Sequence, residues 1–273
     1  MRVLFSLSYC AAMLALTACD TRPRAGDRSP SKLPELTNLA EAAPPELPTV
    51  EQPLTRRDLI LAAIEAANDV MVGTDDAERQ QGLDGRRFSF RIRLCVGTPS
   101  SGRLTFDPEG RVLRASVSAD ITAENPVAAA LSANRFEAVE GFWVPYPWLL
   151  QASCPPAPPS PAPDTIREAA ATTSDPARPT FGLAEFFSPD TDRSIRREGR
   201  PFSVTRRLEE GSAPGPIDLV LRGRLIQLPD AKVINCQPNA TMLPPQCIVS
   251  VRFDVVRLEQ ANGGELLAEW SGA

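Results

Sequence analysis

The sequence contains no histidine among its 273 residues, and aromatic residues make up only 6% of it. The absence of histidine excludes Ser/His/Asp and Cys/His catalytic relays, and it excludes zinc sites of the HExxH type. The six cysteines include no CxxC pair, the other common element of a zinc site. We therefore expect no metal and no cofactor, and few of the usual catalytic groups remain.

Lysine is almost as scarce, because 27 of the 29 basic residues are arginine. The formal net charge is −5, which argues against nucleic acid as a partner. Proline, by contrast, is abundant, with 28 residues against 16 glycines. This excess predicts sizeable linker segments in a chain that is otherwise 42% hydrophobic and able to fold.

The first 18 residues have the pattern of an export signal. The apolar run at 3–16 is too short for a transmembrane helix, which needs about 20 apolar residues. The run ends in Leu16-Thr17-Ala18-Cys19, which resembles the lipobox of bacterial lipoproteins. The resemblance implies that residues 1–18 are removed and that the Cys19 sulfur carries a lipid. An ordinary secretory signal with a chance cysteine is the alternative.

The resemblance also implies a location. A lipoprotein of this kind is held in the bacterial cell envelope by its lipid, with the folded part in the periplasm. Asp20, the residue after the lipid-bearing cysteine, favours the inner membrane over the outer membrane.

Two proline-rich segments divide the rest of the chain. Residues 19–54 are polar and broken by proline, which predicts a disordered tether. About 35 such residues have a root-mean-square reach of roughly 30–35 Å. The second segment, 155–179, joins the two halves of a β-rich domain, 55–154 and 180–273. We favour one domain because neither half has an abundant core, and two small β domains are the alternative.

Hydrophobic periodicity predicts a mainly β fold with one N-terminal helix. The helix is expected at 55–71, where Thr55 and Asp58 form a capping-box pattern. Residues 88–96 alternate between apolar and polar, as a strand with one buried face does. No helix long enough for a crossover follows a strand, which favours an antiparallel sandwich or barrel-like sheet. Further strands are expected at 103–106, 112–121, 136–139, 141–150, 202–208, 217–228, 247–258 and 265–271.

Four cysteines remain after processing, and an even number in an exported chain predicts disulfides. Three connectivities are open. We expect Cys95–Cys154 and Cys236–Cys247, each within its own half. Loop entropy gives roughly 4 kcal/mol for the longer closure and about 2–3 kcal/mol for the shorter one.

Segment 142–148 holds two of the three tryptophans and the one tyrosine outside the expected signal, and Pro145 and Pro147 should confine the chain there to a sheet edge. In an extended chain, alternate side chains of this segment share a face, which could either close the core or dock a partner or sugar ring. We expect Trp143 to be buried and Tyr146 to be the most exposed. The candidate partner-binding residues are Phe142, Trp143, Tyr146 and Trp148.

These observations predict a membrane-anchored lipoprotein whose folded part is a non-enzymatic binding or scaffolding module. An envelope protein or a glycan would be its partner. The alternative, from another class, is a histidine-independent hydrolase that cleaves glycan through paired carboxylates. A cleft with two converging carboxylates would favour the hydrolase, and an exposed aromatic surface would favour binding.

The lipobox pattern predicts that the mature protein is held at the membrane through Cys19. In a Cys19→Ser variant, lipid addition should be lost, because serine lacks the accepting sulfur. Palmitate labelling followed by membrane fractionation measures this, and Cys10→Ser, within the signal, is the control. Labelling that persists unchanged in Cys19→Ser would contradict the assignment.

Overall fold

The structure is a computed structural model. It describes residues 51–74, 77–95, 102–109, 111–132, 135–154, 180–189, 195–210, 215–238, 243–261 and 263–272. The expected signal, almost all of the tether and the proline-rich segment 155–179 lie outside the described residues. Residues 50–273 form one compact unit.

Strands dominate this unit, so the mainly β fold class is confirmed. The helices are α1 (Arg56–Val72), α2 (Ala77–Gln80) and α3 (Pro126–Ser132), with a 3-10 turn η1 (Gln81–Leu83). The strands are β1 (Arg87–Leu94), β2 (Gly102–Asp107), β3 (Val112–Val117), β4 (Ala138–Trp143), β5 (Phe181–Phe187), β6 (Phe202–Arg207), β7 (Ile217–Leu225), β8 (Ile234–Gln237), β9 (Gln246–Gln260) and β10 (Leu266–Ser271).

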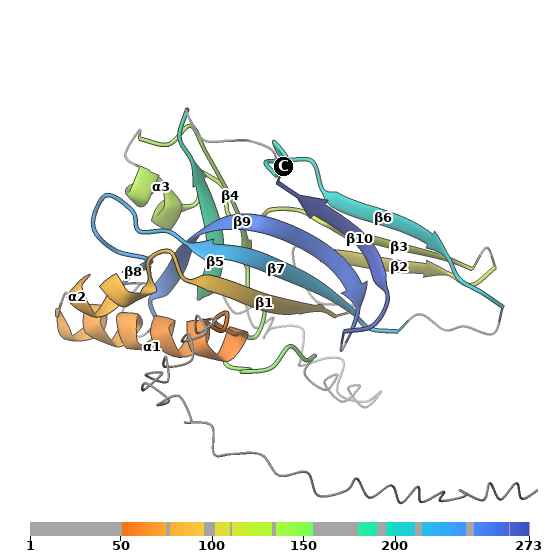
Figure 1. The fold of residues 1–273 in the computed structure, drawn as a ribbon, viewed down its shortest axis with the longest axis horizontal. Coiled ribbons are helices and arrows are strands. Elements are labelled where there is room, and N and C mark those ends of the chain that lie inside the picture. The colour runs from red at the N-terminus through yellow and green to blue at the C-terminus, as the bar shows by residue number, and fades with distance from the viewer. Residues whose placement is uncertain are drawn as a thin grey trace, which may run out of the picture. The chain divides into compact units, whose positions relative to one another are not determined.

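The strands form two sheets (Figure 1). The larger sheet has the order β1-β7-β9-β5-β4, with β8 and β10 also paired to β9, and the smaller sheet has the order β2-β3-β6. The pairs β1–β7, β3–β6 and β4–β5 each join a strand from before residue 154 to one from after residue 180. Strands from the two halves of the chain therefore share both sheets.

Helix α1 begins and ends where the sequence predicts. The Thr55 side chain and the Asp58 carboxylate form the expected capping box, and Gly73 ends the helix in a left-handed conformation. The face that carries Leu59 and Ala63 is buried. This buried face joins α1 to the main core.

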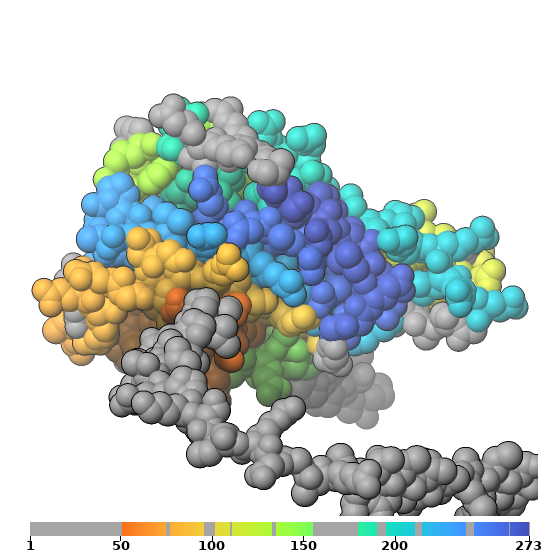
Figure 2. Space-filling view, viewed as in Figure 1, coloured from red at the N-terminus to blue at the C-terminus, as the bar shows by residue number. Residues whose placement is uncertain are grey.

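The main core lies between α1, the smaller sheet and one face of the larger sheet, here called the inner face. On β1 the inner face carries Phe88 and Phe90, and the intervening polar residues mark the outer face. A second cluster lies on the outer face at β5 and β9, where Val127 and Ala128 of α3 pack with Ala184 and Ile248. Figure 2 shows the far ends of β2, β3 and β6 projecting past the larger sheet.

Several elements differ from the sequence prediction. Strands β5 and β8 and helix α3 were not expected, and β5 pairs with β9 in parallel, so the sheet is not purely antiparallel. The strand expected at 141–150 ends at Trp143, and Pro145 follows two residues later. An edge position was expected for this segment, and β4 does lie at the edge of its sheet.

The structure contains both expected disulfides. Cys95 and Cys154 have Cα atoms 5.7 Å apart, and Cys236 and Cys247 have Cα atoms 4.0 Å apart. The second pair lies directly opposite across β8 and β9, in the close spacing of a non-hydrogen-bonded antiparallel pair. Within the described ranges, none of the helices combines the length and apolar character that a membrane span requires.

A β-bulge bends the centre of the larger sheet. Arg222 of β7 faces Val255 of β9, whereas the next residue, Gly223, faces Phe253, so β9 carries one additional residue. A Cβ atom at Gly223 would overlap the carbonyl oxygen of Arg252. Only glycine lets the two strands approach this closely.

Gly223→Ala should therefore lower the free energy of unfolding by about 3 kcal/mol, because the overlapping atoms belong to backbone that cannot rotate away. Gly82→Ala is the matched control, since a Cβ there meets no atom within 4 Å. Urea unfolding of both variants measures the difference. Equal stability of the two variants would contradict the role assigned to Gly223.

Candidate functional site

The four candidate aromatic residues do not share one face. Phe142 is 2% exposed and packs against Phe202 and Phe253, with ring centroids 5.9 Å apart in each pair, so it is a core residue and no partner can reach it. Trp143 is half-buried against the smaller cluster on the outer face. Trp143 and Phe142 thus lie on opposite faces, as in any strand, but the expectation that Tyr146 and Trp148 share the face of Phe142 was wrong, because the strand ends at Trp143.

Trp148 is the most exposed of the four, at 63%, whereas Tyr146 is half-buried. This reverses the expectation that Tyr146 would be the most exposed. Both lie in a turn that the Leu149 N–H closes by donating to the Tyr146 carbonyl at 3.0 Å. The two rings meet edge to face with centroids 5.4 Å apart. The turn therefore presents Trp148 to solvent with Tyr146 bracing its ring.

Tyr146 holds its backbone at φ +52°, in the left-handed region that non-glycine residues seldom adopt. Such a conformation persists only where the surrounding structure enforces it, and it occurs often at binding sites. The Tyr146 carbonyl accepts hydrogen bonds from the Leu149 N–H and from the Arg56 side chain.

Arg56 is the first residue of α1 and is 7% exposed. Its guanidinium donates to three carbonyl groups: Leu149 at 2.9 Å, Arg91 at 3.0 Å and Tyr146 at 3.3 Å. It also lies over the Phe90 ring, 5.0 Å from the centroid. Arg56 thus ties the 146–149 turn to the edge of β1.

Burial lowers the pKa of Arg56 from its ordinary value to about 10. The side chain therefore stays protonated at neutral pH and keeps its hydrogen bonds. The three carbonyl dipoles and the Phe90 ring compensate the buried charge.

Two further contacts fix the loop at its ends. The Val144 N–H donates to the Phe181 carbonyl of β5 at 2.9 Å, and Cys154 is bonded to Cys95 just beyond β1. The loop from 144 to 154 is therefore held at its start, its middle and its end. Its exposed tryptophan stands on a rigid support.

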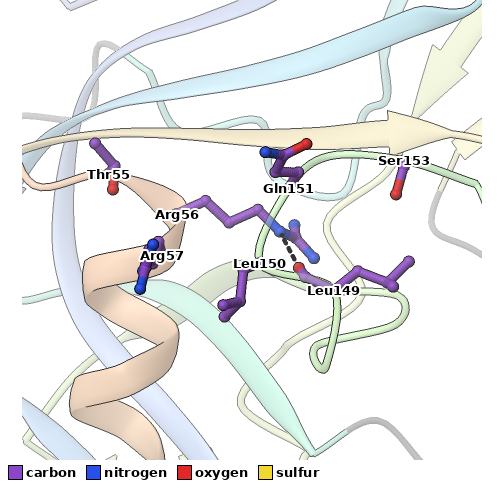
Figure 3. A pocket seen from close by; sticks show the side chains of 7 residues that line it. All are labelled: Thr55, Arg56, Arg57, Leu149, Leu150, Gln151 and Ser153. Atoms are coloured by element: carbon purple, nitrogen blue, oxygen red, sulfur yellow. Dashed lines mark hydrogen bonds between the residues drawn. The ribbon is translucent and has the colours of Figure 1, made fainter.

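A pocket of about 590 Å³ lies where this loop meets α1. Figure 3 shows the Arg56 side chain reaching from the first turn of the helix to the Leu149 carbonyl, while Arg57 lies apart from it. The lining is mixed, since leucines alternate with polar groups that can donate or accept hydrogen bonds. The lining residues are Thr55, Arg56, Arg57, Leu149, Leu150, Gln151 and Ser153.

Two carboxylates come together on the other edge of the sheet. Glu140 of β4 faces Glu185 of β5 directly. Glu140 accepts the N–H groups of Arg197 at 2.8 Å and of Glu198 at 2.6 Å, so it anchors the segment before β6.

Glu185 is 4% exposed and accepts the Phe253 N–H at 3.0 Å. Burial raises its pKa from 4.5 to about 7, against the lowering effects of that hydrogen bond and of the Arg252 charge. A buried carboxylate engaged with the backbone has no room for a polymeric substrate. The pair thus gives the hydrolase alternative no support.

The sequence pointed to the aromatic segment but not to Arg56. In the sequence Arg56 is simply the polar residue after a helix cap, and its carbonyl partners lie between 35 and 93 residues away. The one signal in the sequence was the position of Arg56 on the apolar face of the predicted helix, where a charged residue is unusual. No group of three or more metal-ligating side chains is found in the described part of the chain. No protein-family model, curated protein or solved structure matches this chain.

The raised pKa of Glu185 predicts a distinctive pH dependence. Because the native pKa lies above the unfolded value, the stabilisation from the protonated side chain is complete below about pH 4.5 and is lost as pH rises through about 7. Glu185→Gln keeps an acceptor for the Phe253 N–H but cannot ionise. From about pH 5 to pH 8 the variant should gain on the order of 3 kcal/mol relative to the wild type.

Urea unfolding at a series of pH values measures this difference. Glu269→Gln, on the outer face and paired with Arg257, is the control and should show no such gain. A stability difference between Glu185→Gln and the wild type that stays constant with pH would contradict the assignment.

Proposed function

We propose that this protein is a bacterial envelope lipoprotein, anchored in the membrane through Cys19, whose β-rich domain is a non-enzymatic binding module. The observation that carries the proposal is Trp148, an exposed tryptophan on a turn that a buried arginine fixes from beneath. Single exposed apolar side chains are common on protein surfaces, and Trp148 differs from them because Tyr146 braces its ring on a fixed turn next to a pocket.

The rigid support fits binding better than catalysis. A ligand that stacks on Trp148 meets a ring already ordered by Tyr146 and by the contacts of Arg56, so little conformational entropy is lost on association. The adjoining pocket supplies polar groups at its rim, including Gln151 and Ser153. A sugar ring or an aromatic side chain with polar substituents matches both parts.

The remaining features agree with an envelope location. Two disulfides suit an oxidising compartment such as the periplasm. Among the described residues the site has no histidine and no cysteine free of a disulfide, so the Thr55 and Ser153 hydroxyls of the pocket have no histidine to activate them and serve better as hydrogen-bonding groups.

Trp148→Ala tests the binding role. Because the ring is 63% exposed, its removal should change the free energy of unfolding by less than about 1 kcal/mol, while binding falls at least about tenfold, as for a central aromatic of an interface. Co-sedimentation with purified peptidoglycan measures glycan binding. A photo-crosslinker at position 148, used in intact envelopes, captures a protein partner.

Phe106→Ala is the matched control, since Phe106 is also a partly exposed aromatic, at 37%, but belongs to the smaller sheet. It should retain binding. If Trp148→Ala bound glycan and partner as well as the wild type, or if it unfolded like a core variant, the binding site would lie elsewhere.

A further inference from the structure

The outer face of the larger sheet carries many arginines. In the part of this face that is level with the β9–β10 pairing, acidic residues neutralise them. Each arginine there forms an ion pair with a carboxylate on another strand of the same sheet, and cross-strand pairs of opposite charge stabilise a sheet. The ion pairs are Arg91–Glu259, Arg93–Asp218 and Arg257–Glu269.

The opposite arrangement occurs farther along the same face. Arg87, Arg224 and Arg252 lie directly opposite one another across β1, β7 and β9, and all three are exposed. Arg222 lies two residues from Arg224 on the same face and is half-buried. We call these four residues the arginine row. Like charges directly opposite one another destabilise a sheet, so the row costs the fold stability.

No acidic side chain of the described residues forms an ion pair with the arginine row. Most of the nearby acids have other partners, and Glu185, on which the Arg252 charge acts, is buried and accepts the Phe253 N–H. Glu51 pairs with Arg86, Asp84 accepts the Gln227 N–H at 2.8 Å, and Asp254 is exposed at the bulge. A protein of net charge −5 thus keeps four neighbouring arginines without an ion-pair partner among the described residues, at the bend that the bulge makes in the sheet.

The chain from the N-terminus joins the domain beside this row. The Leu54 N–H donates to the Arg87 carbonyl, and the Ser89 N–H donates to the Leu54 carbonyl, both at 2.8 Å. If residues 20–50 form the disordered tether that the sequence predicts, their root-mean-square reach would be roughly 30 Å. A lipid on Cys19 would therefore hold the arginine row within reach of the bilayer surface.

We infer that the arginine row docks on the phosphate groups of anionic lipids at that surface. The guanidinium group donates two parallel hydrogen bonds to a phosphate, and weak surface binding suffices because the anchor raises the local concentration. Adjacent strands lie about 4.8 Å apart, so the backbone positions of the three opposed arginines span roughly 10 Å, and their long side chains can reach neighbouring head groups. The inference uses the anchor of the proposed function only to bring the domain near the bilayer.

The experiment uses the mature chain from residue 19 with Cys19→Ser, so that lipid attachment plays no part in the result. It is mixed with phosphatidylcholine vesicles containing about 30% phosphatidylglycerol, and binding is measured by sedimentation. Arg87→Gln, Arg224→Gln and Arg252→Gln together should weaken binding about tenfold or more. The triple variant should melt no lower than its parent, because the substitutions remove repulsion.

The matched control replaces Arg103, Arg114 and Arg207 by Gln. These three arginines are exposed on the outer side of the smaller sheet and form no ion pair with described residues, so the loss of charge is the same. The control should bind within about twofold of its parent, and about 0.5 M salt should abolish binding by all three proteins.

Four outcomes would overturn the inference: no binding to the anionic vesicles, equal binding to pure phosphatidylcholine, an equal loss in the control, or no loss in the triple variant. Binding of inositol hexakisphosphate without binding of vesicles would also overturn it, since the phosphate would then come from a soluble compound. Palmitate labelling of the unmodified chain reports on the anchor separately, so either idea can fail alone.

Discussion

Hydrogen bonding along both edges of β9 is the interaction on which the rest of the structure depends. Strands β7 and β8 share one edge of this fifteen-residue strand, and β5 and β10 share the other. Through β7 it positions β1, and through β5 it positions β4, so both halves of the chain are placed relative to one strand. Where β5 has diverged and β10 has not yet joined, the Glu185 carboxylate accepts the Phe253 N–H that would otherwise be unsatisfied. The buried acid thus completes the backbone pairing of β9.

The sequence predicts those parts of the fold that have one buried face. Strand β1 alternates visibly because one side meets the core and the other meets water. Strand β5 is buried at all seven positions and therefore has no alternation to detect. Helix α3 did have a signal, since Pro126 is its first residue and the Asn125 side chain accepts the next free N–H groups. The site itself was only half predictable, because Arg56 acts on carbonyls brought near by folding alone.

Arginine has three different roles in this fold, and its place in the sheet decides which. Arg56 is buried and satisfied by carbonyl dipoles, which gives the Trp148 turn a fixed geometry. Arg93 lies in register with Asp218, and Arg91 forms an ion pair with Glu259, so both arginines have carboxylate partners on other strands. In the arginine row, each of the three opposed arginines faces another arginine on the adjacent strand. The same residue type therefore stabilises one part of the protein and reduces the stability of another, and only the strand register distinguishes the two cases.

The bridge at Leu54 is the weakest attachment that a force on the N-terminal side of the domain would meet. A pull on the chain ahead of residue 51 first loads the two hydrogen bonds of Leu54 and the exposed Glu51–Arg86 pair. The sheet behind them is far stronger, because β1 meets β7 at eight successive positions. Tension would therefore break the hydrogen bonds of the Leu54 bridge first. Further unfolding would be opposed by Arg56, which makes three hydrogen bonds to carbonyl groups. A domain attached at this point can release the few residues from 51 to Leu54 under load while its two sheets stay paired.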